Sequence, residues 1–387
     1  MGVTEPVGFV AAGTHCGIKP DGSPDLSLVA TADAQPATAA AVFTANLATA
    51  APVQVSRRHL DATGGRAAAV VLNSGNANAA TGEAGRDDAE RMCAIVAAEL
   101  GCQATEVLVC STGLIGIPLP MAVIESGIPP LVGARSPDGG VDAAEAIRTT
   151  DTVRKEVVVG GAGFTVGGMA KGAAMLAPNM ATMLAVLTTD AAVDAAVLGE
   201  ALAAAVEDSF NSLSVDGCTS TNDTVIVLAN GSAGAVDAAA LGDALGEACT
   251  SLATQMAEDA EGATKVARVR VTGASSAAEA KQAARKVAES QLVKCSLFGA
   301  DPYWGRIVSE LGTAGVSFDP DRVEVTYGGV VVCSKGIAVA HDADAVRVHL
   351  QGRRIQLTAD LGLGDGEGTI ITNDLTPAYI DENMRTS

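Results

Sequence analysis

The sequence predicts an α/β protein, because apolar runs typical of buried strands alternate irregularly with long segments of helical apolar spacing. Several expected strands come in pairs with glycine between them, as where "GGAG" joins two runs at 160–163, so the sheets should be at least partly antiparallel. Hydrophobic residues make up 48% of the 387 residues but aromatic residues only 3%. The core must therefore be built from alanine, valine, leucine and isoleucine.

Strands are expected where short apolar runs end at turn residues, and helices where apolar residues recur at helical spacing. The expected strands are Ala67–Leu72, Glu106–Cys110, Lys155–Val159, Phe164–Met169, Thr182–Leu187, Thr224–Leu228, Val266–Val271 and the segments 322–333 and 345–359. The expected helices are Ala84–Leu100, Asp194–Glu207, Val236–Asp259 and Ser276–Ser290. The segment "GLGDGEG" at 362–368 precedes a strand-like run rather than a helix, so a turn is favoured over a phosphate-binding loop.

The charge balance and the cysteine pattern exclude several classes of protein. The formal net charge is −20 and no basic patch is visible, which argues against a nucleic-acid or anionic-membrane partner. No apolar run approaches the about 20 residues that span a bilayer, and no signal-peptide pattern is visible at the start. The eight cysteines form no CxxC pair, and the four histidines do not fall near them at zinc spacing, which favours buried, reduced thiols over a metal site. We expect a cytoplasmic protein that acts on small molecules.

The first candidate for chemistry is a strand that ends in hydroxyl residues and glycine. In "LVCSTGLIG", residues 108–116, the apolar run leads into Ser111, Thr112 and Gly113. A hydroxyl residue followed by glycine lets an O–H and a backbone N–H point into one space, as an oxyanion hole requires. An ordinary strand-to-loop turn is the alternative. The asparagine-rich segment 71–82 is also open to two interpretations, a polar ligand site or a turn held by its own side chains.

The segment around Lys171 and Thr182 carries the sharpest signal. Lys171 follows a glycine-rich approach, where it would either hold a substrate carboxylate or lie exposed at a turn. Thr182 lies where a loop containing Pro178 and Asn179 enters an apolar run. If the Ala181–Thr182 bond is cut, the new α-amine, with a reference pKa of about 7.7–8.0, can act as the base for the adjacent hydroxyl. A strand threonine without chemistry is the alternative.

Ten segments, in order along nearly the whole chain, carry a resemblance to a known family. They are Gly2–Phe9, Ala41–Asn46, Asn73–Gly82, Cys110–Gly116, Thr149–Thr152, Met169–Ala191, Phe210–Thr224, Asp259–Lys265, Asp301–Arg306 and Asn373–Asn383. The most specific is the long run "MAKGAAMLAPNMATMLAVLTTDA". On these segments the sequence resembles the ornithine acetyltransferase family, the self-cleaving glutamate N-acetyltransferases of arginine biosynthesis.

The resemblance implies that the chain cleaves itself between Ala181 and Thr182, giving an α chain of residues 1–181 and a β chain of residues 182–387. It implies a layered α/β sandwich resembling N-terminal nucleophile hydrolases, and a heterotetramer of two α and two β chains. Thr182 is then the nucleophile, and Thr112 and Gly113 match the oxyanion-hole residues. The residues that match substrate-binding positions are Thr149, Lys171, Thr182, Glu261, Asn383 and Ser387, with Thr386 as the alternative to Ser387.

The implied reaction moves the acetyl group of N-acetylornithine to glutamate, by ping-pong through an acetyl ester on Thr182. No metal or organic cofactor is implied, and use of acetyl-CoA as a co-substrate stays open. Two alternatives come from other classes: an N-terminal-nucleophile amidohydrolase or aminopeptidase, and an uncleaved small-molecule binding protein. In the first, water accepts the acyl group, so free acetate distinguishes it. In the second, the chain keeps its full mass.

Overall fold

The computed structural model describes residues 2–175 and 183–384, which form two compact units. Within these residues, unit 1 comprises 2–175, 183–211 and 218–256, and unit 2 comprises 212–217 and 257–384. The units do not coincide with the predicted α and β chains, because the predicted cut would fall inside unit 1. Each unit combines β-sheet with α-helices, which confirms the α/β class.

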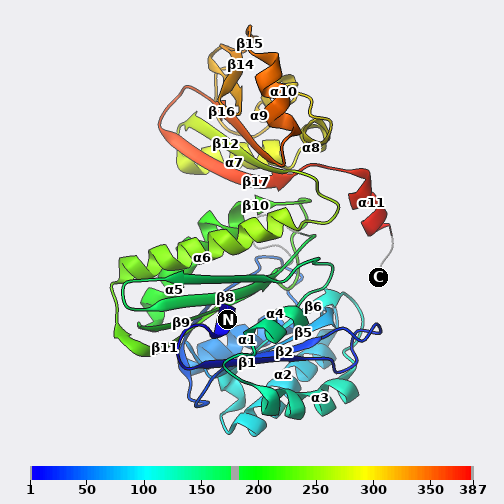
Figure 1. The fold of residues 1–387 in the computed structure, drawn as a ribbon, viewed down its shortest axis with the longest axis vertical. Coiled ribbons are helices and arrows are strands. Elements are labelled where there is room, and N and C mark those ends of the chain that lie inside the picture. Colours follow the sequence, from blue (N-terminus) through cyan, green and yellow to red (C-terminus); the bar gives the residue numbers. More distant parts are fainter. Residues whose placement is uncertain (1, 176–182, 385–387) are drawn as a thin grey trace. The chain divides into compact units, whose positions relative to one another are not determined.

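In the described part of unit 1, the strands follow the order β1-β2-β5-β6 in one sheet and β4-β3-β11-β9-β8-β7 in another (Figure 1). The strands are β1 (Phe9–Thr14), β2 (Leu26–Thr31), β3 (Ala37–Phe43), β4 (Arg66–Ala67), β5 (Ala69–Asn76), β6 (Val107–Leu114), β7 (Lys155–Gly160), β8 (Thr165–Lys171), β9 (Leu184–Ala192) and β11 (Thr224–Ala235). The helices are α1 (Ala51–Thr63), α2 (Gly82–Leu100), α3 (Met121–Ala134), α4 (Gly140–Ala146), α5 (Ala195–Asp208) and α6 (Ala238–Glu258).

The two sheets of unit 1 pack face to face between helices. One face of the sheet β1-β2-β5-β6 packs on α2 and α3, with Val71 and Met92 in a shared apolar cluster. Its other face packs on the second sheet, and Leu72 and Val186 belong to the cluster between them. Helices α5 and α6 lie along the outer side of the second sheet (Figure 1). Unit 1 is therefore a layered sandwich of helix, sheet, sheet and helix, as predicted.

Local signals account for the helix ends in unit 1. Helix α1 has Pro52 in its first turn, where a missing N–H costs nothing, and it ends at Gly64 with φ of +64°. Helix α5 begins after Asp194, whose carboxylate accepts the backbone N–H of Val197 over 3.0 Å. The predicted start of this helix at Asp194 is thus its capping residue.

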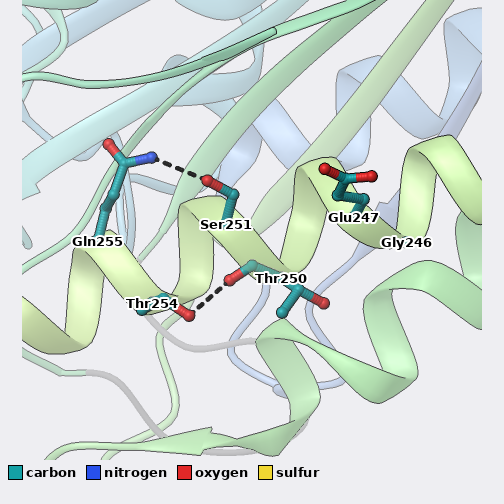
Figure 2. Close-up of a pocket in the computed structure, with 6 residues that line it drawn as sticks. All are labelled: Gly246, Glu247, Thr250, Ser251, Thr254 and Gln255. Carbon is teal, nitrogen blue, oxygen red and sulfur yellow. Dashed lines mark hydrogen bonds between the residues drawn. The ribbon is translucent and has the colours of Figure 1, made fainter. Parts of the chain in front are cut away.

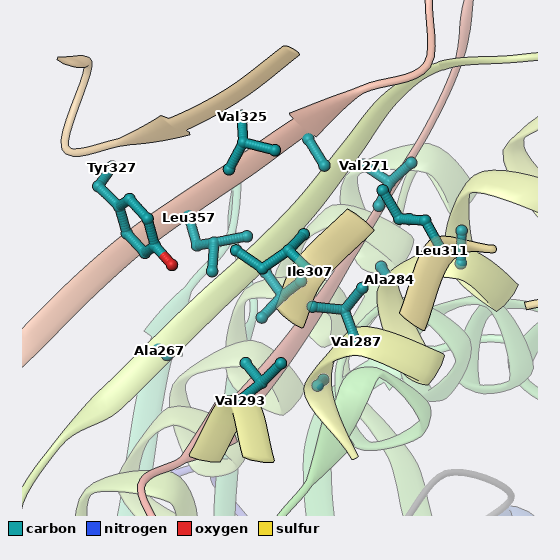
Figure 3. Packing of buried hydrophobic residues seen from close by; sticks show 14 of the residues in the cluster. Ala267, Val271, Ala284, Val287, Val293, Ile307, Leu311, Val325, Tyr327 and Leu357 are labelled. Carbon is teal, nitrogen blue, oxygen red and sulfur yellow. The ribbon is translucent and has the colours of Figure 1, made fainter. Parts of the chain in front are cut away.

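In the described part of unit 2, the strand order is β10-β17-β12-β16-β13-β14-β15. The strands are β10 (Leu213–Ser214), β12 (Val266–Ala274), β13 (Glu324–Tyr327), β14 (Val330–Ser334), β15 (Ile337–Ala338), β16 (Arg354–Asp360) and β17 (Gly366–Asn373). The helices are α7 (Ala277–Ala288), α8 (Gln291–Phe298), α9 (Gly305–Leu311), α10 (Ala343–Gln351) and α11 (Pro377–Asn383). Figure 3 shows the core, where Val271 and Leu357 of the sheet meet Val287 and Ile307 of the helices.

The predicted strand at 345–359 is wrong in its first half, which is helix α10. Asp342 caps this helix, because its carboxylate accepts a backbone N–H of the first turn over 2.9 Å. Val346 and Leu350 lie four residues apart and are fully buried, whereas Val348 between them is 65% exposed. Burial therefore follows the helical period, although apolar and polar residues alternate in the sequence as they would in a strand.

The other predicted strands and helices are confirmed in the described residues, with ends that differ by a few positions. Several elements are not predicted, among them β3, whose sequence "ATAAAVF" offers too little contrast between polar and apolar residues to show a period. All eight thiols are free, as predicted, but Cys218 and Cys295 are exposed rather than buried. Across residues 2–175 and 183–384, no helix has both the length and the apolar character needed to cross a membrane.

Candidate active site

Strand β6 carries Thr112 and Gly113 at the end that it shares with β5. The two strands run parallel, with Ser74 opposite Thr112 and Gly75 opposite Gly113, and the register shifts immediately afterwards. Gly113 has φ of +132°, and a Cβ at this position would lie 2.3 Å from the carbonyl carbon of Gly75. The site therefore requires glycine, so that two backbones can approach closely. The Thr112 side chain beside it is buried.

Lys171 ends strand β8 and contacts Thr112. Strand β8 pairs antiparallel with β9, which places Lys171 opposite Leu184. The lysine is only 2% exposed, and its Nζ donates to Thr112 Oγ1 over 3.3 Å. The interpretation of Lys171 as an exposed turn residue is therefore wrong. The structure brings two of the predicted site residues, which lie 59 positions apart in sequence, into direct contact.

Asp151 connects Lys171 to a second buried lysine. Its Oδ1 accepts hydrogen bonds from Lys155 Nζ over 2.6 Å and from the Gly172 N–H over 2.7 Å. Its Oδ2 accepts the Thr149 N–H over 3.2 Å and lies 4.0 Å from Lys171 Nζ. Thr149, another predicted site residue, thus reaches the cluster through its backbone. Both carboxylate oxygens of Asp151 are held by at least two neighbours.

The pKa of Asp151 shows that its neighbours outweigh its burial. Burial raises the pKa of a carboxyl group, but the charges of Lys171 and Lys155 and the hydrogen bonds from Gly172 and Lys155 lower the pKa of Asp151 to about 2. Asp151 is therefore ionised at neutral pH. Lys171 therefore brings a positive charge into contact with Thr112, which favours the binding of negative charge there.

Asp223 anchors the chain at the start of β9. Its Oδ1 accepts the Met183 N–H over 2.8 Å, while the Thr224 N–H donates to the Met183 carbonyl over 3.2 Å. Burial raises the pKa of Asp223 well above its usual range, and the Met183 N–H and the charge of Lys171 offset only part of that rise. Met183 directly follows the predicted nucleophile in the chain. A buried carboxyl group therefore fixes the residue next to Thr182.

The asparagine-rich segment comprises the end of strand β5 and the loop after it, and its own side chains hold it, as one of the two interpretations predicts. The interpretation as a polar ligand site stays a prediction. Asn73, Asn76 and Asn78 are buried. Asn73 Nδ2 donates to the Asn76 carbonyl over 2.8 Å, and Asn78 Nδ2 donates to the Gly85 carbonyl over 2.7 Å. These amides satisfy backbone carbonyls next to the strand ends. Their contribution is to hold the end of β5 beside β6.

In unit 2, the predicted site residues Glu261 and Asn383 lie together. Asn383 Nδ2 donates to Glu261 Oε2 over 2.7 Å. Glu261 is buried, whereas Asn383 is exposed at the end of α11. The Thr376 hydroxyl at the start of α11 donates to the Gly262 carbonyl over 2.6 Å, which ties this helix to the loop that carries Glu261. The two residues thus form one polar pair, and their contact with a substrate stays a prediction.

Four predicted residues lie outside the described residues, so their roles stay predictions: Ala181, Thr182, Thr386 and Ser387. Sequence reasoning also misses three residues that the structure places in the cluster, Asp151, Lys155 and Asp223. The carboxylate of Asp151 and the ammonium of Lys155 lie four residues apart in the sequence, which is the signal that was available. Their burial comes from tertiary packing, which a local pattern does not contain.

A surface cavity of about 440 Å³ lies along α6 (Figure 2). It is lined by Gly246, Glu247, Thr250, Ser251, Thr254 and Gln255. Gln255 Nε2 donates to Ser251 Oγ over 3.3 Å, and Thr254 Oγ1 donates to the Thr250 carbonyl over 2.8 Å. None of the predicted site residues lines this cavity. Among the side chains that the structure describes, no three His, Cys, Asp or Glu groups converge to hold a metal ion.

Comparison with known proteins gives a consistent set of relatives. The model of the ArgJ family matches residues 10–386. The chain is 46% identical to an arginine biosynthesis bifunctional protein ArgJ from Thermobifida fusca, over 99% of both chains. It is 48% identical to the protein of the same name from Mycobacterium leprae, over 99% of this chain and 95% of that one. A solved structure of ornithine acetyltransferase from Mycobacterium tuberculosis, complexed with ornithine, is 46% identical with a TM-score of 0.42, covering 46% of this chain and 94% of that one.

Proposed function

Since the chain belongs to the ArgJ family, whose model spans residues 10–386, it is an acetyltransferase of arginine biosynthesis, and we propose that it moves the acetyl group of N-acetylornithine to glutamate. The observation that supports this reaction is the buried contact between Lys171 and Thr112, beside the chain that enters β9. The Thr112 hydroxyl, the Gly113 backbone N–H and the Lys171 ammonium group together suit an oxyanion.

The first half of the proposed reaction acetylates the enzyme. After cleavage of the Ala181–Thr182 bond, the Thr182 hydroxyl attacks the acetyl carbonyl carbon, and the Thr182 amine takes the hydroxyl proton. The Thr112 hydroxyl and the Gly113 N–H donate to the oxyanion that forms. The C–N bond to ornithine then breaks, the proton passes to the departing amine, and the acetyl group remains as an ester on Thr182.

The second half returns the acetyl group to an amine. The α-amine of glutamate attacks the ester carbonyl, the same two donors hold the second oxyanion, and the proton from that amine returns to the Thr182 oxygen as the C–O bond breaks. N-acetylglutamate and free Thr182 result. In this proposal the substrate-binding residues are those that match the family's positions: Thr149, Lys171, Glu261, Asn383 and Ser387, with Thr386 as the alternative to Ser387. Lys171 pairs with the substrate carboxylate, and Glu261 pairs with an amino group.

Labelled acetyl groups test the proposed function directly. The purified chain is incubated with N-acetylornithine labelled in its acetyl group, with and without glutamate, and both small molecules and polypeptides are analysed by mass spectrometry. We expect labelled N-acetylglutamate when glutamate is present, and a labelled 182–387 chain when it is withheld. Thr182→Ser, which keeps a hydroxyl, is the matched control for Thr182→Ala, which should stay uncut and inactive. Labelled acetate as the main product would instead indicate a hydrolase.

The remaining parts of the proposal concern co-substrate, assembly and location. The relatives are named bifunctional, which supports a second reaction in which acetyl-CoA acetylates glutamate directly. An assay with acetyl-CoA and glutamate, without N-acetylornithine, tests this second reaction. We also propose an assembly of two α and two β chains in the cytoplasm. Native mass spectrometry of the purified protein tests the assembly, since each chain should appear twice.

A further inference from the structure

Four buried side chains form a continuous polar path in unit 1. Lys155, Asp151, Lys171 and Thr112 are all no more than 3% exposed. Lysine and aspartate are almost never fully buried unless they are paired, and here two lysines share one aspartate. An ordinary structural ion pair needs only one lysine. The second lysine extends the path to the hydroxyl that the proposed reaction uses as an oxyanion donor.

The direction of the last hydrogen bond follows from chemistry. A lysine ammonium group carries three donors and no acceptor. In the contact of 3.3 Å, Lys171 Nζ must therefore donate and Thr112 Oγ1 must accept. The hydroxyl hydrogen of Thr112 then points away from Lys171 and is available to another acceptor. A positive donor on the oxygen also polarises the O–H bond, which makes that hydrogen a stronger donor.

Asp151 fixes both the backbone and the side chain of the lysine that makes this contact. Its Oδ1 accepts the N–H of Gly172, the residue after Lys171, over 2.7 Å, and its Oδ2 lies 4.0 Å from Lys171 Nζ. Lys155 Nζ in turn donates to Oδ1 over 2.6 Å. The carboxylate thereby offsets the cost of burying the Lys171 charge, which would be high for an unpaired ammonium group.

We propose that Asp151 and Lys155 are positioning residues for the oxyanion hole, which hold Lys171 against Thr112 so that the Thr112 hydroxyl donates only to the developing oxyanion. This inference rests on the proposed function, because it needs Thr112 to act in acetyl transfer. It gives Lys171 a role through Thr112 that is separate from binding a substrate carboxylate. If the inference holds, Asp151 affects kcat through Thr112, separately from any effect on KM that follows from moving Lys171 and Thr149.

A double-mutant cycle tests the inference. The variants are Thr112→Val, Asp151→Asn and both together, with kcat and KM measured for acetyl transfer per cleaved chain. Thr112→Val should lower kcat by about 10²–10³. Asp151→Asn should lower kcat by about 10–100-fold, by analogy with other supporting groups around a functional centre. In the Thr112→Val background, the added Asp151→Asn change should lower kcat by less than about twofold, because the group it positions is already absent.

Controls separate this role from a general effect on folding. Asp190→Asn changes another buried aspartate of unit 1, whose Oδ1 accepts the Thr165 N–H over 2.7 Å, and should leave kcat unchanged. If Asp151→Asn fails to fold because two buried ammonium groups face each other, Asp151→Asn combined with Lys155→Met removes one positive and one negative charge. This charge-balanced pair then takes the place of Asp151→Asn in the same cycle.

The outcomes distinguish failure of the inference from failure of the proposed function. If Thr112→Val lowers kcat but the Asp151 change lowers it by the same factor in both backgrounds, Asp151 acts independently of Thr112 and the inference is overturned. A large rise in KM with unchanged kcat on Asp151→Asn would also overturn it. If Thr112→Val itself leaves kcat unchanged, the oxyanion role of Thr112 in the proposed function fails, and the inference fails with it.

Discussion

The pKa values of two buried aspartates in unit 1, Asp151 and Asp223, shift in opposite directions, and the groups around each carboxyl explain why. Asp151 has two lysine charges and a backbone N–H beside it, and its pKa falls to about 2 in spite of burial. Burial raises the pKa of Asp223 well above its usual range. The Met183 N–H and the charge of Lys171 lower this pKa, but by less than burial raises it. Burial therefore does not decide the protonation state by itself. In Asp151 the charges of Lys171 and Lys155, with the hydrogen bonds from Gly172 and Lys155, outweigh it.

The low pKa of Asp151 predicts an acid-dependent contribution to stability. Its carboxyl pKa is about 2 when folded and about 3.9 when unfolded, so the stabilisation is present above pH 4 and is lost as the pH falls toward 2. The shift corresponds to about 2 kcal/mol. Urea unfolding of the parent and of Asp151→Asn with Lys155→Met should show a difference in unfolding free energy that changes by this amount between pH 5 and 2. A difference that stays constant with pH would contradict the prediction.

At the residue scale, the sequence predicts the residues that belong to recognisable motifs. It misses the residues that hold those motif residues in place. Thr112, Gly113 and Lys171 can be named because hydroxyl, glycine and glycine-flanked lysine are recognisable types in recognisable places. Asp151 and Lys155 cannot, because an aspartate and a lysine four residues apart are common on protein surfaces. Only the packing of β7 and β8 shows that this pair is fully buried.

Among the elements, strand β6 depends on glycine at one position for two separable reasons. Gly113→Ala adds a side chain where φ is +132° and where the new Cβ would lie 2.3 Å from the Gly75 backbone. We expect the unfolding free energy to fall by about 3 kcal/mol or more. Gly116→Ala is the matched control, since its φ is +82° but no atom lies within 4 Å of the new Cβ, and it should cost about 1–2 kcal/mol. Equal losses in urea unfolding would show that the clash is relieved by movement.

Helix α10 shows how a local pattern can mislead. The letters of residues 345–350 alternate as in a strand, and on that basis Val346, Val348 and Leu350 would share one buried face. In the helix only the first and last do. Leu350→Ala should therefore lower the unfolding free energy of the protein by about 2–5 kcal/mol. Val348→Ala, the matched control on the exposed side, should change it by less than about 0.5 kcal/mol, and a comparable loss would favour the strand.

For the whole molecule, the sequence predicts the fold class and the family but not the division into units. The α/β class can be predicted because apolar residues recur at strand or helix spacing in most of the elements. The unit boundary cannot, because Leu213 and Ser214 pair with β17 across a long sequence separation, which leaves no mark in composition. The alanine-rich elements in the first 63 residues are also missed, since alanine is compatible with helix and strand alike.

Cleavage at Ala181–Thr182 should leave two chains that stay associated. Strands β8 and β9 flank the predicted cut and pair directly, from Val166 with Thr189 to Lys171 with Leu184. Strand β9 is also paired with β11 on its other side. We expect two bands in denaturing electrophoresis but one species in native mass spectrometry, and a single full-length band for Thr182→Ala. Separation of the two chains without denaturant would contradict the prediction.

The pairing of β8 with β9 also makes the polypeptide divisible at the level of the gene. The hydrogen bonds between these strands join two segments directly, so their alignment does not require a peptide link at residues 181 and 182. Two open reading frames, one for 1–181 and one for an initiator methionine followed by 182–387, would then encode the same molecule. Removal of the methionine would expose the threonine amine without any self-processing. If such a split gene restored growth of a strain that lacks the enzyme, self-cleavage would no longer be required for activity. Each half of the protein could then be mutated separately.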